Sequence, residues 1–166
     1  MSHAHTMTGK WGQRGVPHRG WTCVDVRDLG TPARRCQMCE SQMIRFVHEM
    51  RHPQYPQTLA VGCVCAGKME ENYQAAEERE RRLQNRARRR QNWLSRRWDV
   101  SEKGNEYIRS DGYHVVVFRR RRGWGAVITD ESTGEQIHSE RFYATPDDVK
   151  LAAFDKITVL ASRQRR

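Results

Sequence analysis

The sequence predicts an α+β protein with a small cysteine-bearing module, a long arginine-rich helix and a β-β-β-α unit, in that order. Three observations predict this fold class: all five cysteines lie within residues 1–65, residues 66–98 contain no proline, and residues 99–166 alternate short apolar runs with turn residues. Only 37% of the 166 residues are hydrophobic and 30% are charged. We therefore expect one ordinary domain or two small ones, and no single large core.

The first segment, residues 1–19, is rich in glycine, histidine and polar residues. We expect it to be a flexible arm that precedes the folded part of the chain. Its two early histidines, His3 and His5, are not expected to take part in a site.

Residues 20–68 are predicted to form a compact module built from short strands. Alternation of apolar and polar residues is typical of a strand with one buried face. A turn at 29–32 and a proline-containing break at 52–56 separate these strands, because proline removes a hydrogen-bond donor and fixes φ. The candidate strands cover residues 21–26, 43–48 and 58–62.

Four of the five cysteines form two close pairs inside this module. Cys36 and Cys39 are spaced Cys-x-x-Cys, and Cys63 and Cys65 are spaced Cys-x-Cys where the helix is predicted to start. Each pair can supply two ligands from one tight turn, as a tetrahedral metal site requires. The sequence therefore predicts a structural Zn²⁺ bound by Cys36, Cys39, Cys63 and Cys65.

Other interpretations of these residues stay open. His48 and His52 are the alternative ligands if one thiol of the second pair points away. A redox Cys-x-x-Cys would need a βαβ context that the neighbouring sequence lacks, and the thiols could also be reduced and merely buried. That last role is the one expected of Cys23, which has no close cysteine neighbour. The order of a Cys-x-x-Cys turn, a β-hairpin and a thiol pair at a helix N-terminus is that of a treble-clef zinc finger.

A catalytic zinc would keep one ligand position open for water. His48 and His52, four residues apart, could then belong to the centre of a metal-dependent nuclease. No further constellation of acids and histidines accompanies them, and Pro53 argues against a helix that presents both. We therefore expect no enzyme activity and keep the nuclease as an alternative.

Residues 66–98 are predicted to form one long helix, whose basic part covers 69–98. Apolar residues recur with a helical rhythm, acids fill the early turns and nine arginines the later ones, which matches the helix dipole. Ten basic and five acidic residues place half of the formal charge of +10 on this element. Because arginine contacts phosphate in a bidentate manner and stacks on bases, the helix predicts nucleic acid as the partner.

A solvated helix between two domains is the alternative interpretation of this segment. Pairs such as Glu77–Arg81 and Glu78–Arg82, four residues apart, would stabilise its first half. The stretch 86–97 offers no acids of its own, so its arginines would repel one another without a polyanion.

Residues 99–166 predict a three-stranded meander covered by one helix. The strands are expected over 113–118, 124–129 and 136–142. Thr145 and Pro146 mark the helix start, as a cap and a first helical residue. Four consecutive arginines, 119–122, form the predicted tip of the first hairpin, where they can reach phosphate or protect a sheet edge.

The predicted nucleic-acid contacts are the arginines of the helix and the hairpin together with one adjacent tryptophan: Arg79, Arg82, Arg86, Arg89, Arg90, Arg96, Arg97, Arg119, Arg120, Arg121, Arg122 and Trp124.

Several stretches also carry a resemblance to known proteins. Residues 20–30 (Gly-Trp-Thr-Cys-Val-Asp-Val-Arg-Asp-Leu-Gly), the Cys36-x-x-Cys39 motif with residues 44–48 (Ile-Arg-Phe-Val-His), and residues 61–69 (Val-Gly-Cys-Val-Cys-Ala-Gly-Lys-Met) together resemble a widespread group of small, uncharacterised bacterial proteins. The likeness continues through 93–98 and 151–155, so it covers nearly the whole chain. It implies a bacterial, cytosolic origin, and no activity is known for the group.

The C-terminal third is similar in layout to the plant ethylene-response DNA-binding domain. In that family a three-stranded sheet carrying arginine and tryptophan enters the major groove, and a helix backs the sheet. Arg119 to Arg122, Trp124 and Arg141 occupy roughly comparable places. The layout is also similar to that of double-stranded-RNA-binding domains, although the first helix of that family is not evident here.

Taken together, the sequence predicts a non-enzymatic, zinc-containing nucleic-acid-binding protein of bacterial or phage origin, which clamps phosphates with its helix and hairpin. The alternative is an accessory or inhibitory subunit of a nucleic-acid-processing or defence complex. No apolar run approaches the roughly 20 residues of a membrane span, and the N-terminus lacks the apolar core of a secretory signal. We therefore expect a cytoplasmic protein without a membrane partner.

Overall fold

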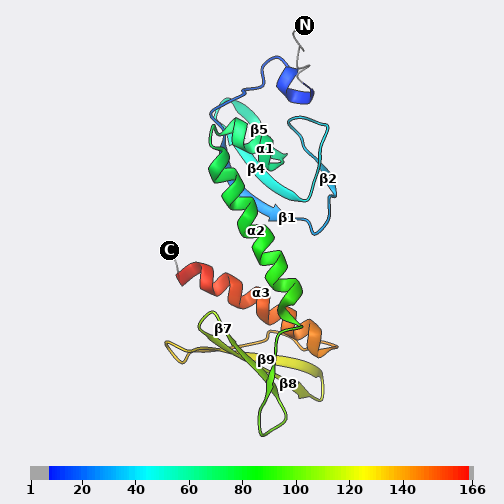
Figure 1. The fold of residues 1–166 in the computed structure, drawn as a ribbon, viewed down its shortest axis with the longest axis vertical. Coiled ribbons are helices and arrows are strands. Elements are labelled where there is room, and N and C mark those ends of the chain that lie inside the picture. The colour runs from blue at the N-terminus through cyan, green and yellow to red at the C-terminus, as the bar shows by residue number, and fades with distance from the viewer. Residues whose placement is uncertain (1–7, 165–166) are drawn as a thin grey trace. The chain divides into compact units, whose positions relative to one another are not determined.

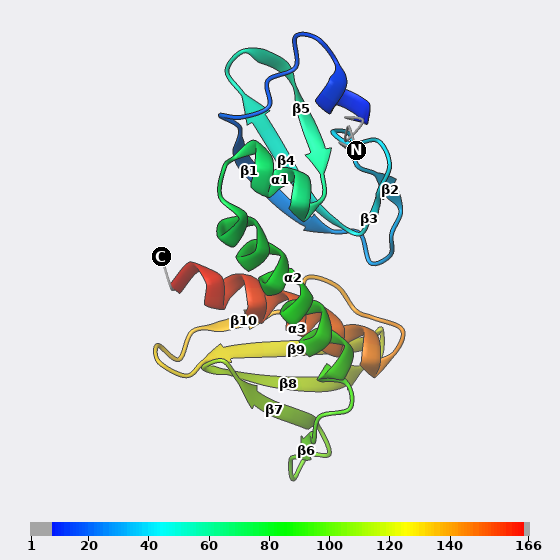
Figure 2. The same ribbon diagram turned by 45° about the horizontal axis from the view of Figure 1, so that its top comes forward.

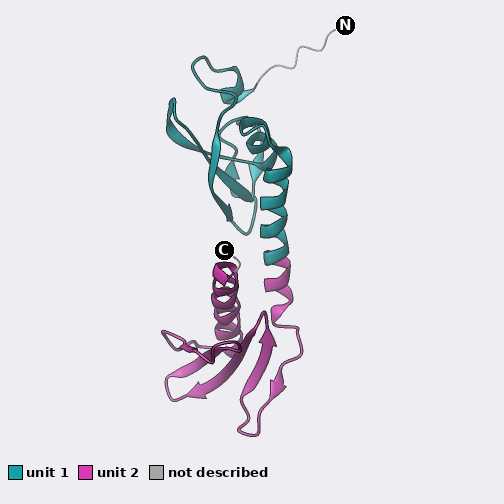
Figure 3. Ribbon diagram, turned by 90° about the vertical axis from the view of Figure 1, so that its left-hand side faces the viewer, with its two compact units in different colours: residues 1–86 teal, residues 87–166 magenta. Residues whose placement is uncertain are grey.

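The computed structural model describes residues 8–164, and the predictions for His3 and His5 lie outside this range. The chain contains both helices and sheets, as the α+β class requires (Figure 1). It divides into two compact units, residues 1–86 and 87–166 (Figure 3). The boundary falls inside helix α2 (Tyr73–Trp93), and each unit has its own core.

The first unit is built on a three-stranded antiparallel sheet in the order β1-β4-β5, with a small two-stranded sheet β2-β3 beside it (Figure 2). Helix α1 follows β5 after a single residue, Gly62, which is its N-cap. The three strands predicted from the sequence correspond to β1, to β3 with β4, and to β5. The bounds are β1 Thr22–Asp28, β2 Arg34–Arg35, β3 Met43–Ile44, β4 Phe46–His52, β5 Tyr55–Val61 and α1 Cys63–Met69.

Residues 8–19, which the sequence predicts to be part of a flexible arm, contain a short helix and contact the sheet module. A short 3-10 helix, η1 (Gly9–Gly12), is fastened to the sheet module because the backbone N–H of Lys10 donates to the Met38 carbonyl at 2.8 Å. Val16 is buried, and Trp11 packs against the same core. These two apolar side chains supply the burial that holds the segment in place.

The single long helix predicted over 66–98 is in fact two helices. Helix α1 ends at Met69 and α2 begins at Tyr73, and between them Glu71 adopts a positive φ of 55°. The side chain of Asn72 accepts a hydrogen bond from the Ala75 N–H at 3.0 Å, which is the role of an N-cap. A Cβ on Gly67 would lie 2.7 Å from the Tyr73 ring, so the chain turns back closely at this break.

The second unit holds a five-stranded antiparallel sheet in the order β10-β9-β8-β7-β6, with helix α3 against one face (Figure 2). The predicted meander corresponds to β8, β9 and β10, although β10 is shorter than expected. The sequence interpretation missed β6 and β7. The bounds are β6 Asp99–Val100, β7 Glu106–Ser110, β8 Tyr113–Arg120, β9 Gly123–Asp130, β10 Gln136–His138 and α3 Pro146–Gln164.

The core of the second unit lies between the sheet and α3. Val115, Val117 and Ile128 point into it from the strands, and Phe154 enters from α3. The last turn of α2 contributes Trp93, which is 1% exposed and donates from Nε1 to the Lys150 carbonyl at 2.8 Å. Within residues 8–164, none of the helices has both the length and the apolar character that crossing a membrane demands.

Candidate functional site

Three of the four cysteines predicted as ligands come together in the first unit. Cys36 and Cys39 lie in the connection between β2 and β3, and Cys65 lies in the first turns of α1. Their sulfur atoms all lie within 4.8 Å of one another, and Cys36 and Cys65 are buried. This group could hold a metal ion.

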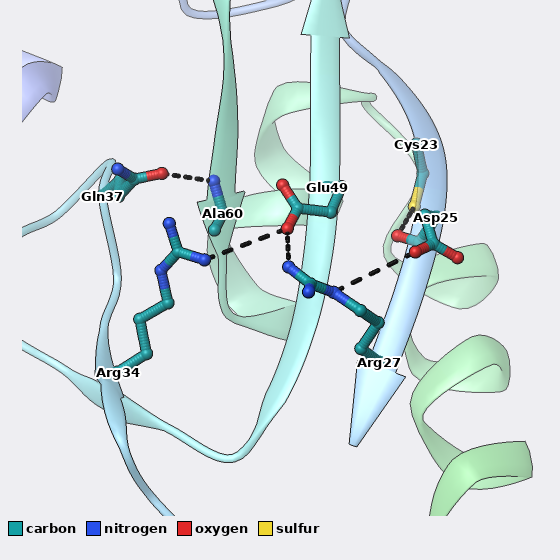
Figure 4. A network of polar contacts seen from close by, with 7 residues as sticks. All are labelled: Cys23, Asp25, Arg27, Arg34, Gln37, Glu49 and Ala60. Carbon is teal, nitrogen blue, oxygen red and sulfur yellow. Dashed lines mark hydrogen bonds and ion pairs between the residues drawn. The ribbon is translucent and has the colours of Figure 1, made fainter. Parts of the chain in front are cut away.

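The cysteine turn is fastened to the strand that leads into α1. The backbone N–H of Gln37 donates to the Ala60 carbonyl at 2.9 Å, and the Gln37 side-chain oxygen accepts from the Ala60 N–H at 2.7 Å (Figure 4). The turn itself closes through the Glu40 N–H, which donates to the Cys36 carbonyl at 2.9 Å while Glu40 adopts a φ of 57°. These bonds fix the position of the turn against β5, only a few residues before Cys65.

The surroundings of Cys36 favour its thiolate. Its pKa lies below the ordinary value of a thiol, first because the Cys65 thiol donates a hydrogen bond to it and then because the backbone amides of Cys39, Gly62 and Met38 do so. The pKa of Cys65 is correspondingly raised by the same bond and by burial. Because thiolates are the form that binds metals, a sulfur surrounded by amide donors suits a metal ligand.

Cys63, which the sequence predicts as a fourth ligand of the same ion, does not lie in this group. Both Cys63 and Cys65 lie on α1. Residues separated by two positions on an α-helix differ by about 200° in direction, so the side chains of Cys63 and Cys65 leave the helix on nearly opposite sides. Cys63 instead lies with His48 of β4 and Glu80 of α2, and the ligand atoms of these three residues are within 4.8 Å of one another.

His48, predicted only as an alternative ligand, is fully buried in this second group. Neither ring nitrogen has a hydrogen-bond partner among the described residues. Burial, with a smaller contribution from the nearby Arg79 charge, lowers the pKa of His48 to about 4. The ring is therefore neutral at pH 7, and the 3.7 Å approach of its Nε2 to Glu80 Oε2 is not an ion pair.

The Glu80 carboxyl and the Cys63 thiol beside His48 are held in their protonated forms more strongly than usual. Burial, followed by the charges of Glu80 and Glu77, raises the pKa of Cys63 to about 11. Burial also raises the pKa of Glu80. A positive ion placed between these groups would relieve both effects.

The remaining candidates of the first unit lie apart from both groups. The ring of His52 packs against Trp21, with centroids 5.3 Å apart, and its Nδ1 accepts from the Gln54 N–H at 3.0 Å. Cys23 is half-buried and directs its sulfur to the Asp25 carbonyl at 3.4 Å (Figure 4). Neither residue belongs to a ligand group within the part of the chain that the structure describes.

The arginines of α2 have acidic partners that the local sequence did not reveal. Arg89 pairs with Asp111, and Arg90 contacts Asp155 at 3.1 Å; both acids lie far along the chain. The expectation that the arginines of the stretch 86–97 lack acidic partners is therefore wrong. Other predicted contacts also have partners: Arg79 with Glu70, Arg82 with Glu78, Arg97 with Asp99 at 3.6 Å, and Arg96 with the Ser110 hydroxyl at 3.0 Å.

The arginines of the β8–β9 hairpin have no such partners. Arg119 and Arg120 extend β8, and Arg121 and Arg122 form the turn. All four are exposed, and among residues 8–164 none of them forms an ion pair. Trp124, in contrast, is half-buried, packs against the core of the second unit and has the Arg119 guanidinium 6.0 Å from its ring centroid.

The sheet face opposite α3 forms a further basic surface, which sequence reasoning missed because it missed β7. Strand pairing aligns Arg109 with His114, and Tyr107 with Val116, on this face. The guanidinium of Arg120 lies 5.3 Å from the Phe118 ring centroid. We call this surface the open sheet face, and it consists of Tyr107, Arg109, His114, Val116, Phe118, Arg120, Val127 and Thr129.

The open sheet face is only partly shielded from solvent. Arg109 and Arg120 are exposed, and even Val116 and Val127 of the central strands are not fully buried. At its edge, Arg96, Arg97 and Arg109 line a hollow of about 430 Å³ together with Asp99, Tyr107 and Ile108. Aromatic rings and cations therefore share one surface of the second unit.

Comparisons with known proteins give no relative for this chain. No protein-family model matches it, and neither a curated protein nor a solved structure matches it.

Proposed function

We propose that this protein is a zinc-stabilised, non-enzymatic nucleic-acid-binding protein, and that its ligand contacts the open sheet face and the Arg119–Arg122 hairpin. The observation that carries the proposal is the open sheet face itself, where aromatic rings lie beside two exposed guanidinium groups: that of Arg120, and that of Arg109, which also contacts Glu131 at 3.1 Å. Bases stack on aromatic side chains, and phosphates bind arginine, so one surface offers both kinds of contact.

The aromatic residues of this face support base contacts. Tyr107 and His114 meet edge to face with ring centroids 5.4 Å apart, and Phe118 lies next to Gly125 on the neighbouring strand. A Cβ on Gly125 would come within 2.9 Å of the Phe118 ring, so glycine leaves space for that ring to lie across the sheet. Flat rings on a sheet are a known platform for single-stranded bases.

The charge of the hairpin supports phosphate contacts. Four adjacent guanidinium groups without acidic partners repel one another in the free protein, and a polyanion would relieve that repulsion. The helix α2 contributes less than the sequence predicted, because several of its arginines are neutralised within the protein.

Zinc is the metal that best suits the first ligand group. Thiolate-rich sites with tetrahedral geometry are typical of Zn²⁺, and three sulfurs would fill three of its four positions. The ion would tie the β2–β3 turn to the start of α1, in the manner of a treble clef. In a unit with so small a core, that link would contribute directly to folding.

The experiment is a binding titration with labelled single-stranded and duplex DNA and RNA across a salt series. The Arg109→Ala/Arg120→Ala variant should weaken binding. It should also reduce the steepness of the fall of the log binding constant with log salt concentration, by about 0.7 to 0.9 for each lost phosphate contact. Arg14→Ala, an exposed arginine of the first unit, is the control for charge alone. Equal binding by the double variant and the unmodified chain would overturn the proposal.

A second candidate function, docking of a protein partner as an accessory subunit, is favoured by a hollow in the first unit. The hollow measures about 960 Å³, and its rim carries the exposed apolar side chains of Met43, Val64 and Tyr73. Exposed apolar groups beside a cavity are typical of interaction sites. Under this hypothesis Val64→Glu would abolish a stoichiometric complex, whereas nucleic acid would bind weakly to all forms.

A further inference from the structure

A buried histidine without partners is the starting point. His48 lies on β4, is 0% exposed, and has neither Nδ1 nor Nε2 hydrogen-bonded within residues 8–164. Buried polar atoms are almost always satisfied by protein, water or an ion, so two orphaned nitrogens on one ring need an explanation. The Glu80 carboxylate, which is only partly exposed, faces the ring, and the positive charge of Arg79 also acts on it.

The distance between His48 and Glu80 distinguishes a direct hydrogen bond between them from an ion that both residues bind. The 3.7 Å between His48 Nε2 and Glu80 Oε2 is too long for a hydrogen bond. An imidazole nitrogen and a carboxylate oxygen on a tetrahedral zinc, each about 2.0 to 2.2 Å from the ion, lie about 3.3 to 3.5 Å from each other. The observed spacing of 3.7 Å is only slightly longer than that of two such ligands on one metal ion.

Cys63 supplies a third donor to the same place. Its sulfur lies within 4.8 Å of the His48 and Glu80 ligand atoms. The three residues come from three different elements, β4, α1 and α2, so the backbone of the first unit fixes their arrangement. A thiolate, an imidazole and a carboxylate are the donor types found on Zn²⁺.

We propose that His48, Cys63 and Glu80 form a second divalent-metal site, distinct from the Cys36–Cys39–Cys65 group, and that Zn²⁺ is the ion that it binds. The two sites share helix α1 but use opposite sides of it, through Cys63 and Cys65. Three protein ligands leave the fourth position of a tetrahedral ion to water. Glu80 and Cys63 both line the hollow of the first unit, so water can reach the ion from there.

Two metal sites on one short helix would explain the Cys-x-Cys spacing. If both cysteines bound a single ion, their side chains would have to point the same way. Residues i and i+2 of a helix instead point to nearly opposite sides. One cysteine for each of two ions fits the helical geometry without distortion. The bound ion would also fasten the first turns of α2 to the sheet, because Glu80 lies on α2 and His48 on β4.

The test is a metal count on the full chain after loading with Zn²⁺ and removal of free ion. We expect two equivalents for the unmodified protein, and one for Cys63→Ser and for Glu80→Gln. Cys23→Ser, which removes a thiol outside both groups, should keep two equivalents. Glu80→Gln keeps the size and partial exposure of the side chain, so loss of metal in this variant does not depend on a folding defect.

Replacement of Zn²⁺ by Co²⁺ gives a second reading of the same variants. The thiolate-to-cobalt absorption should be dominated by the three-sulfur group and should persist in Glu80→Gln. A single equivalent in the unmodified chain that both variants retain would overturn the proposal. So would the loss of all metal in Cys63→Ser, since that result would place Cys63 on the same ion as Cys36, Cys39 and Cys65.

Discussion

Cys63 and Cys65, separated by one residue on helix α1, belong to two different ligand groups. Cys65 faces Cys36 and Cys39, whereas Cys63 faces His48 and Glu80. The helix accounts for this separation, because an offset of two residues corresponds to about 200° of rotation around its axis. The two cysteines should therefore respond differently to substitution.

Cys65→Ser should remove the metal of the three-cysteine group and destabilise the first unit. A ligand present at 100 times its dissociation constant stabilises the folded state by about 2.7 kcal/mol, and that contribution would be lost. The measurement is the thermal unfolding of the zinc-loaded chain, with Cys23→Ser as the control thiol. An unchanged midpoint and metal content in Cys65→Ser would contradict the assignment.

The sequence predicted much of the first unit because its signals are local. The strands alternate apolar and polar residues, and Cys36 and Cys39 have the spacing of a metal-binding turn. The division of Cys63 from Cys65 could also have been predicted, since it needs only the helical period. The sequence named His48 only as an alternative ligand, and its position beside Cys63 and Glu80 could not have been predicted, because that position depends on the register that places His48 opposite Val61.

The second unit shows the same contrast between local and long-range information. Asp111 and Gly112 have positive φ values of 55° and 81°, and Asp-Gly is a strong hairpin signal, so β7 could have been predicted from the sequence. The ion pairs of Arg89 and Arg90 could not, because their acids are reached only through the tertiary fold. That difference shifts the expected nucleic-acid contacts from α2 to the sheet.

Trp93→Phe should destabilise the second unit. The indole Nε1–H donates to the Lys150 carbonyl in a buried environment, and phenylalanine would remove this bond at a cost of about 0.5 to 1.5 kcal/mol. Urea unfolding measures the change. Trp98→Phe is the matched control, because Trp98 is only partly buried and its longer bond, 3.4 Å to the Trp93 carbonyl, should contribute less.

Asp28→Asn should destabilise the first unit at neutral pH but not in strong acid. Arg45 donates two hydrogen bonds to the carboxylate, at 2.7 and 2.9 Å, and the Gly30 N–H donates a third at 2.8 Å. The Arg45 bonds above all hold the pKa of Asp28 below its ordinary value of 3.8. The carboxylate therefore stabilises the fold above pH 3.8, and this contribution disappears as the pH falls through the lowered pKa.

The measurement is the free energy of unfolding of both proteins between pH 7 and pH 2. The difference between them should be constant near neutrality and should shrink below pH 4. Asp25→Asn, another acid of β1, controls for charge. A difference that persists undiminished at pH 2 would show that the loss arises from packing rather than from the ionised carboxylate.

Arg89→Ala/Arg90→Ala should affect stability more than nucleic-acid binding. Arg89 pairs with Asp111 and Arg90 with Asp155, so the two side chains act first within the second unit. Because these pairs are largely exposed, each contributes about 0.2 to 1 kcal/mol. The open sheet face should keep its affinity and its salt dependence in this variant.

The comparison that decides this point is with Arg119→Ala/Arg120→Ala, which removes the same charge from groups that form no ion pair within the described residues. The hairpin variant should lose affinity and flatten the salt dependence, while its unfolding midpoint stays close to that of the unmodified chain. If the α2 variant instead loses affinity to the same extent, the phosphates follow the helix as the sequence first predicted, and the internal ion pairs must open when nucleic acid binds.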